Sequence, residues 1–137
     1  MGISLTPRMK NWIEKLGVHV AVATRSGMPT VLVSFTCEVD GDTVKIPLTK
    51  AQVEQVKEII RENSQVALAP GQLGAVRAPY QFKGKGSLET DTLVVKVEEI
   101  YCTKPGAEAG LRLDTMGYEA MKEFDESRWK DLEPPQL

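Results

Sequence analysis

The chain has 137 residues, 42% of them hydrophobic and 26% charged, with a formal net charge of −2. This size suits one domain with a core of its own, and the near-neutral charge without a basic stripe argues against a nucleic-acid binder. No apolar run approaches the roughly 20 residues that span a bilayer, and the N-terminal stretch lacks the apolar core of a secretory signal. We therefore expect a single cytoplasmic domain over residues 1–137, with neither a nucleic acid nor a membrane as its partner.

The first element is predicted to be a helix with the sequence "TPRMKNWIEKLG". Thr6 is a suitable N-cap, and Pro7 falls at the first helical position, where its missing N–H costs nothing. Gly17 is a natural stop. One apolar face repeats at helical spacing, and it consists of Met9, Trp12, Ile13 and Leu16.

Three β patterns follow, at residues 18–24, 30–39 and 43–48. The second alternates along its length, which predicts one continuous strand with a shared face. That face comprises Val31, Val33, Phe35, Cys37 and Val39. The "DGD" sequence between the second and third patterns predicts a tight hairpin turn.

A second helix is expected at residues 50–63, followed by strands at 65–70, 80–89 and 92–102 and a terminal helix at 113–132. Residues 71–79 form a predicted loop, and 133–137 a loose tail. Short turns between consecutive strands indicate antiparallel pairing. The order therefore predicts a mainly β fold with α elements, namely a small six-stranded antiparallel barrel with flanking helices.

The start of the second helix, "LTKAQVEQVK", allows two interpretations. Thr49 and Gln52 fit a capping box, which explains both without a ligand. Lys50 fits less well, because a cation in the first turn opposes the helix dipole. A bound anion beside the free amide groups would explain it.

The strand "YQFKGKGSLE" carries a second ambiguous signal. Gly84 and Gly86 remove side chains from one face, which indicates either a barrel corner or the close approach of a flat ligand. Gln81 would offer such a ligand both a donor and an acceptor.

Other chemistry is disfavoured by the residue inventory. Cys37 and Cys102 match no zinc or redox spacing and are expected to be free thiols. His19 has no second histidine or nearby cysteine with which to share a metal. The mixed charges of "KEFDESRWKD" predict a solvated helix face. We therefore expect no catalytic acid, base or nucleophile.

The order of these segments resembles the FMN-binding split-barrel family, which includes pyridoxamine phosphate oxidase. The resemblance covers residues 6–113. It rests on "GVHVAVATRSGMPTVLVSF", "DGDTVKIPL", "VKEIIRENSQVAL" and "YQFKGKGSLE". It implies a split β-barrel, a homodimer with FMN in a cleft at its interface, and oxidoreductase or electron-carrier activity toward a small-molecule or redox partner.

The resemblance also implies a set of cofactor-binding residues. The isoalloxazine ring would lie against the second strand, the phosphate would lie at the mouth of the second helix, and a strand glutamine would contact the flavin. In this sequence these positions are Val33, Ser34, Phe35 and Thr36 for the ring, Thr49, Lys50, Gln52, Gln55 and Lys57 for the phosphate, and Gln81 for the glutamine.

One departure from the family pattern leaves alternatives open. Family members carry a basic or hydroxyl pair in the first turn of this helix, and that pair falls here on Gln55 and Val56. Either Lys50 takes its place, or phosphate binding is weakened or lost. The alternative function is a non-enzymatic binding protein on the same fold, for haem, for a deazaflavin or for no cofactor.

Overall fold

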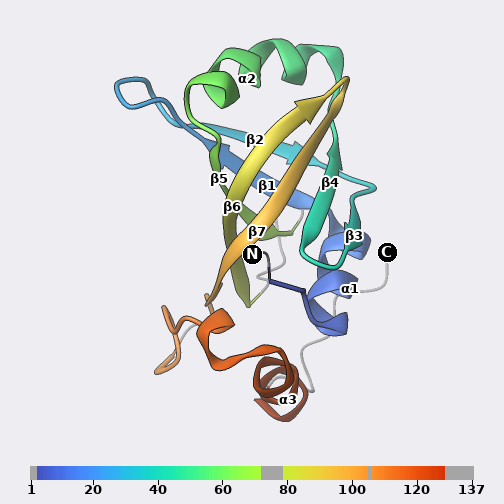
Figure 1. Ribbon diagram of the computed structural model, residues 1–137, viewed down its shortest axis with the longest axis vertical. Coiled ribbons are helices and arrows are strands. Elements are labelled where there is room, and N and C mark those ends of the chain that lie inside the picture. Colours follow the sequence, from blue (N-terminus) through green and yellow to red (C-terminus); the bar gives the residue numbers. More distant parts are fainter. Residues whose placement is uncertain (1–2, 72–78, 105, 129–137) are drawn as a thin grey trace.

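The structure, a computed structural model, describes residues 3–71, 79–104 and 106–128 and shows helices packed around a single curled sheet (Figure 1). The helices are α1 (Pro7–Leu16), α2 (Lys50–Glu62), the 3₁₀ turn η1 (Asp114–Met116) and α3 (Tyr118–Arg128). The strands are β1 (Val18–Val22), β2 (Thr30–Ser34), β3 (Glu38–Asp40), β4 (Thr43–Pro47), β5 (Gln65–Pro70), β6 (Tyr80–Glu89) and β7 (Thr92–Cys102). Most of the predicted loop at 71–79, Trp129 and the predicted tail lie outside the described residues.

All strand pairs are antiparallel, and the order across the sheet is β2-β1-β5-β6-β7-β4-β3. The mainly β class with flanking helices is confirmed. The prediction of six strands is wrong, because the sheet has seven. The additional strand arises where residues 30–39, predicted as one strand, divide into β2 and β3.

The division occurs at Thr36, whose φ of 57° is in the left-handed region. One residue in this conformation breaks the two-residue alternation, so the side chains on either side of it no longer share a face. Val31 and Phe35 are 61% and 47% exposed, whereas Cys37 and Val39 are buried. The single apolar face predicted for this segment is therefore wrong.

The first helix forms as predicted and closes one side of the core. Thr6 caps α1 by accepting a hydrogen bond from the Met9 amide at 3.3 Å, and Pro7 occupies the first turn. Its whole predicted apolar face is buried: Met9, Trp12, Ile13 and Leu16. Burying apolar surface contributes roughly 25 cal/mol per Å², or about 1.5–3 kcal/mol for each large side chain. This face is therefore a major contribution to stability.

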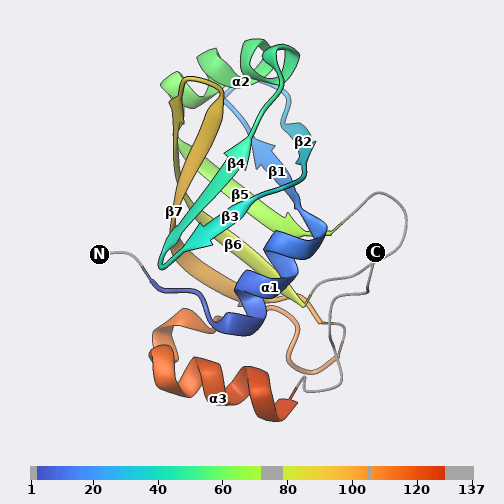
Figure 2. The same ribbon diagram turned by 90° about the vertical axis from the view of Figure 1, so that its right-hand side faces the viewer.

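The other two helices lie at opposite ends of the barrel, α2 at one end and α3 at the other (Figures 1 and 2). Val56 and Ile60 of α2 are buried. The last helix starts later than predicted, because residues 114–116 form a 3₁₀ turn that ends at Gly117, whose φ is 92°. The part of the prediction beyond residue 128 lies outside the described chain.

The glycines of β6 are explained by the barrel itself. The register shifts between Lys83 and Gly84. A Cβ at Gly84 would lie 2.0 Å from the Lys96 carbonyl oxygen, and one at Gly86 would lie 3.0 Å from a Leu93 methyl group. The close approach is therefore made by the neighbouring strand β7, and the barrel-corner interpretation is correct.

The free thiols are also confirmed, since Cys37 and Cys102 are both buried and unbridged. Burial raises the pKa of Cys37 to about 11 and raises the pKa of Cys102 as well. A thiol with a raised pKa supplies little thiolate near neutral pH, so neither residue is suited to nucleophilic chemistry.

Candidate functional site

The barrel is split between β2 and β4, which are not neighbours in the sheet. Side chains join the two sides of this seam where strand hydrogen bonds would close a full barrel. The Ser34 hydroxyl donates to the Pro47 carbonyl oxygen. The Gln52 side-chain amide donates to the Val33 carbonyl oxygen at 2.9 Å. Two predicted site residues of β2, Val33 and Ser34, thus meet the end of β4 and the start of α2, where a third, Gln52, lies.

The mouth of α2 is organised by the predicted capping box. The Thr49 hydroxyl accepts from the Gln52 backbone amide at 3.1 Å, and the Gln52 side-chain oxygen accepts from the Thr49 amide at 3.0 Å. Both ends of the Gln52 side chain are therefore engaged, one in the cap and the other across the seam. The amides of Lys50 and Ala51 remain without an intrahelical acceptor, as in any first helical turn.

The cations of α2 differ in their surroundings. Lys50 is exposed in a first turn that contains no acidic residue, and it makes no ion pair within the described residues. Lys57 pairs with Glu54 at 2.9 Å and lines a hollow of about 450 Å³ between α2 and the β6–β7 hairpin. Gln55 is exposed. Lys50 is consequently the cation that is best placed to meet an anion at the helix mouth.

Beside the seam, the outward face of the sheet is apolar and partly uncovered. Val31 and Phe35 are exposed on or next to β2, Val33 is half-buried, and Met28 in the preceding turn is 86% exposed. The face continues over small side chains, because Val31 is aligned with Ala21 and Ala67 across β1 and β5. These alanines line a hollow of about 330 Å³.

Thr36 and Gln81 occupy different surroundings from the seam hydrogen bonds. Thr36 is exposed just beyond β2, and its hydroxyl donates to the Phe35 carbonyl oxygen at 2.6 Å. Gln81 lies on β6 opposite Tyr101. The β6–β7 turn is the part of this hairpin near the helix mouth, since the Leu48 amide donates to the Asp91 carbonyl oxygen at 2.8 Å. β6 ends beside this turn at Glu89. At about 3.3 Å per residue, Gln81 is roughly 26 Å further along the strand, so the fold of one chain does not bring it to the helix mouth.

A polar cluster that was not predicted from the sequence lies at the opposite end of the molecule. Asp125 of α3 is 1% exposed, and its Oδ2 accepts a hydrogen bond from the Thr6 hydroxyl. The prediction that this helix face is solvated is therefore wrong at Asp125. A signal was present, because Met121 and Asp125 are four residues apart and share one side of the helix.

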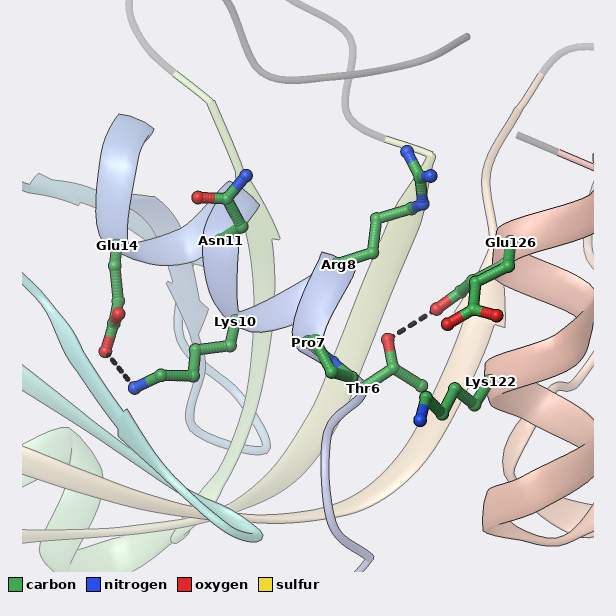
Figure 3. A pocket seen from close by; sticks show the side chains of 9 residues that line it. Thr6, Pro7, Arg8, Lys10, Asn11, Glu14, Lys122 and Glu126 are labelled. Atoms are coloured by element: carbon green, nitrogen blue, oxygen red, sulfur yellow. Dashed lines mark hydrogen bonds and ion pairs between the residues drawn. The ribbon is translucent and has the colours of Figure 1, made fainter. Parts of the chain in front are cut away.

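This cluster borders a pocket of about 490 Å³ between α1 and α3 (Figure 3). Its charged lining is mixed, and it consists of Arg8, Lys10, Glu14, Lys122, Asp125 and Glu126. Lys10 and Glu14 pair within α1 at 2.8 Å. With cations and anions in equal number, the lining offers no clear selection for a ligand of one charge.

The described residues contain no group of three or more histidine, cysteine, aspartate or glutamate side chains arranged to hold a metal ion. None of the helices within residues 3–71, 79–104 and 106–128 has the length and apolar character needed to cross a membrane.

Comparison with known proteins identifies the fold. No protein-family model matches the chain, and no curated protein matches it. Among solved structures, HupZ of Group A Streptococcus is 20% identical, with a TM-score of 0.60 over 77% of this chain and 99% of that one. A pyridoxamine 5'-phosphate oxidase-like protein of Lactobacillus delbrueckii is 18% identical, with a TM-score of 0.57 over 72% and 93% of the two chains. The chain therefore has the split-barrel fold of these proteins.

Proposed function

We propose that the protein is an FMN-binding flavoprotein that acts as an oxidoreductase or electron carrier and works as a homodimer. The observation that carries this proposal is the juxtaposition at the seam. An uncovered apolar strand face, suited to a flat ring, is joined through Gln52 to a helix mouth. The lysine there has no ion pair among the described residues and is suited to a phosphate.

The residues fit the cofactor with a division of roles. Lys50 and the first-turn amides would hold the phosphate, while Val33, Ser34 and Phe35 would border the ring. Gln52 would position this site more than bind the cofactor, because both ends of its side chain are already engaged. FMN supplies hydride or electron transfer when bound, and the chain supplies orientation and hydrogen bonds.

A homodimer would account for two features that a single chain leaves open. Gln81 lies well away from the helix mouth of its own chain, and a second chain could bring its own Gln81 to the site. The exposed side chains of Met28, Val31 and Phe35 are also grouped at the edge strand β2, and exposed apolar groups of this kind favour association.

The first test is the absorption spectrum of the purified protein, followed by titration with FMN. Bound flavin is expected to give bands in the blue and near-ultraviolet, and the protein is expected to sediment as a dimer. A colourless monomer that takes up no FMN from excess would reject the proposal.

The phosphate position is tested by Lys50→Ala. Loss of a charge-assisted contact should weaken FMN binding by roughly 1.5–3 kcal/mol, which is about 10- to 150-fold in Kd. Lys15→Ala, which removes an exposed lysine from the last turn of α1, is the matched control and should leave the affinity unchanged. Equal affinities for both variants would move the phosphate away from the helix mouth.

A second candidate is haem binding by the same barrel, and His19 is the observation that favours it. Its half-buried side chain lies on the outward face of β1, aligned with Val33 and Ala69 in the neighbouring strands. A histidine beside a flat apolar surface can serve as an axial ligand of haem iron. Haem titration of the protein and of His19→Ala distinguishes this candidate, and mass spectrometry of a co-purified ligand would identify a deazaflavin.

A further inference from the structure

The attachment of α3 to the rest of the protein depends on few buried groups. Of the α3 side chains that the structure describes, Met121 and Asp125 are buried and Phe124 is half-buried. The other residues from Tyr118 to Ser127 are at least partly exposed. A helix held by so small a contact is expected to open locally at a lower free energy than the barrel unfolds.

Asp125 connects α3 to the first turn of α1. The Thr6 hydroxyl donates to Asp125 Oδ2 and at the same time accepts from the Met9 amide, so one hydroxyl serves both the helix cap and the contact between helices. The second oxygen, Oδ1, is buried and completes no hydrogen bond of ordinary geometry with the described residues, although the Tyr80 hydroxyl lies close enough to this carboxyl to interact with it. An ionised carboxylate in this position would have one oxygen that is at best weakly hydrogen-bonded and away from water, which is costly.

Other ionisable groups face this carboxyl from each packed element. Arg8, with Lys10 and Glu14 nearby, comes from α1, and Lys122 and Glu126 come from α3 itself. Tyr80 approaches from β6 and Cys102 from β7.

Burial is the largest influence on the group, and it raises the pKa of Asp125 to about 6 from its ordinary 3.8. The Thr6 hydroxyl, Tyr80 and the positive charge of Arg8 lower the pKa, but together they do not offset burial. The burial of Tyr80 and its closeness to Asp125 raise the pKa of that phenol, so it stays protonated.

We propose that Asp125 and Thr6 form a pH-sensitive latch, which holds α3 against α1 in mild acid and loosens it as the pH rises toward neutrality. Docked Asp125 retains a proton that it loses when α3 opens to solvent. The contribution of this proton to docking is complete below the ordinary aspartate pKa. It is lost as the pH rises through the pKa that Asp125 has when α3 is docked. The latch is independent of the proposed cofactor, because α3 lies at the end of the barrel opposite α2 (Figure 1).

The size of the effect follows from the difference between the pKa of Asp125 when α3 is docked and its pKa when α3 is open to solvent. A shift of about two units corresponds to roughly a hundred-fold change in the docking equilibrium over the whole titration, of which about tenfold falls between pH 5 and pH 7. Hydrogen exchange of the α3 amides, corrected for intrinsic rates at each pH, measures this equilibrium. Protection of α3 is expected to fall about tenfold between these pH values while β6 and β7 keep theirs.

Two variants separate the latch from general charge effects. Asp125→Asn keeps an acceptor for Thr6 and removes the titration, so its α3 protection should be the same at pH 5 and pH 7. Glu123→Gln removes an exposed carboxylate from the same helix and should retain the wild-type pH dependence. Equal protection of wild-type α3 at both pH values would overturn the proposal, and so would a parallel loss in β6 and β7.

A direct measurement keeps the test decisive if Asp125→Asn fails to fold. The carboxyl carbon of Asp125 can be titrated by NMR in the unmodified protein. A midpoint near 6, accompanied by shifts of the Thr6 and Met9 amides, supports the latch. A midpoint near the ordinary value overturns it.

Discussion

The two edges of the sheet, β3 and β2, differ in how far other parts of the protein cover them. At the β3 edge, both backbone groups of Val39 are taken by α1: Glu14 accepts from its amide at 2.9 Å, and Lys10 donates to its carbonyl oxygen at 2.8 Å. At the β2 edge, Gln52 takes the Val33 carbonyl oxygen, and the side chains of Val31 and Phe35 remain exposed.

This difference indicates where a partner can bind. An uncovered edge strand with apolar side chains favours association, and proteins usually cover such edges with charged groups or another element. The β3 edge is covered in this way by a charged pair from α1. The β2 edge is not, so a second chain or a flat ligand would bury more apolar surface there than at β3.

A substitution at Gly17, which packs against the end of β2, should have the largest effect on stability. Gly17 joins α1 to β1 with φ 77° and ψ −168°, a region open almost only to glycine, and a Cβ there would lie 2.2 Å from the Ser34 carbonyl oxygen. Gly17→Ala should therefore lower the free energy of unfolding by roughly 3 kcal/mol or more, measured by urea denaturation.

Gly41→Ala is the matched control for Gly17. Gly41 also has a positive φ, 62°, but nothing lies within 4 Å of the position of its Cβ. Backbone strain alone should cost it about 1 kcal/mol. Equal losses in the two variants would show that the close approach to Ser34 contributes nothing beyond the strained dihedral angle.

The seam can be tested more finely with Gln52→Ala. This change removes one half of the capping box and leaves the Val33 carbonyl oxygen without its donor, for an expected loss of about 1–2 kcal/mol. Gln55→Ala, on an exposed position of the same helix, should change stability by less than about 0.5 kcal/mol. Hydrogen exchange in β2 should become faster in the first variant only.

Contrary results would alter the comparison of the edges. If Gln52→Ala lowers stability while β2 keeps its protection from exchange, the capping box carries the whole effect and the bond across the seam contributes little. The main difference between the two edges would then be that β3 is held to a helix, α1, whereas β2 is not firmly held to α2. The difference in exposure would matter less.

Local signals predicted the elements, and long-range contacts decided the rest. Caps and apolar spacing were sufficient for α1 and for the start of α2, because those signals lie within a few neighbouring residues. The break at Thr36 could not be foreseen, since threonine has no preference for a positive φ and the alternation continues in the sequence on both sides. Burial of Asp125 depends on Thr6, 119 residues away, and nothing local to α3 reveals that partner.

The candidate site was predictable to a different degree at each position. The capping box of Thr49 and Gln52 was visible as a sequence spacing. The second bond of Gln52, to Val33, was not, because it depends on how the barrel curls. Whether the ten predicted cofactor contacts form remains a prediction for the binding experiments.

Weakening the contact between Glu14 and the β3 edge should have the smallest effect on stability. Burial raises the pKa of Glu14, but hydrogen bonds from Lys10 and the Val39 amide, with the charge of Lys10, outweigh it and leave the pKa lowered. The contact therefore stabilises the protein above the ordinary glutamate pKa, and this contribution is lost as the pH falls through the lowered value. Because the Glu14 side chain is 32% exposed, Glu14→Gln should cost less than about 1 kcal/mol at pH 7.

The difference between wild type and Glu14→Gln isolates this edge, because all other titrating groups are common to the two proteins. Urea denaturation at pH 7 and pH 3 should show the difference shrinking in acid. Glu58→Gln, which affects an exposed pair with Arg61 at 3.4 Å on α2, should show almost no difference at either pH. A Glu14→Gln effect that is unchanged at pH 3 would mean that the ionised carboxylate does not hold the β3 edge, and that packing of α1 alone covers it.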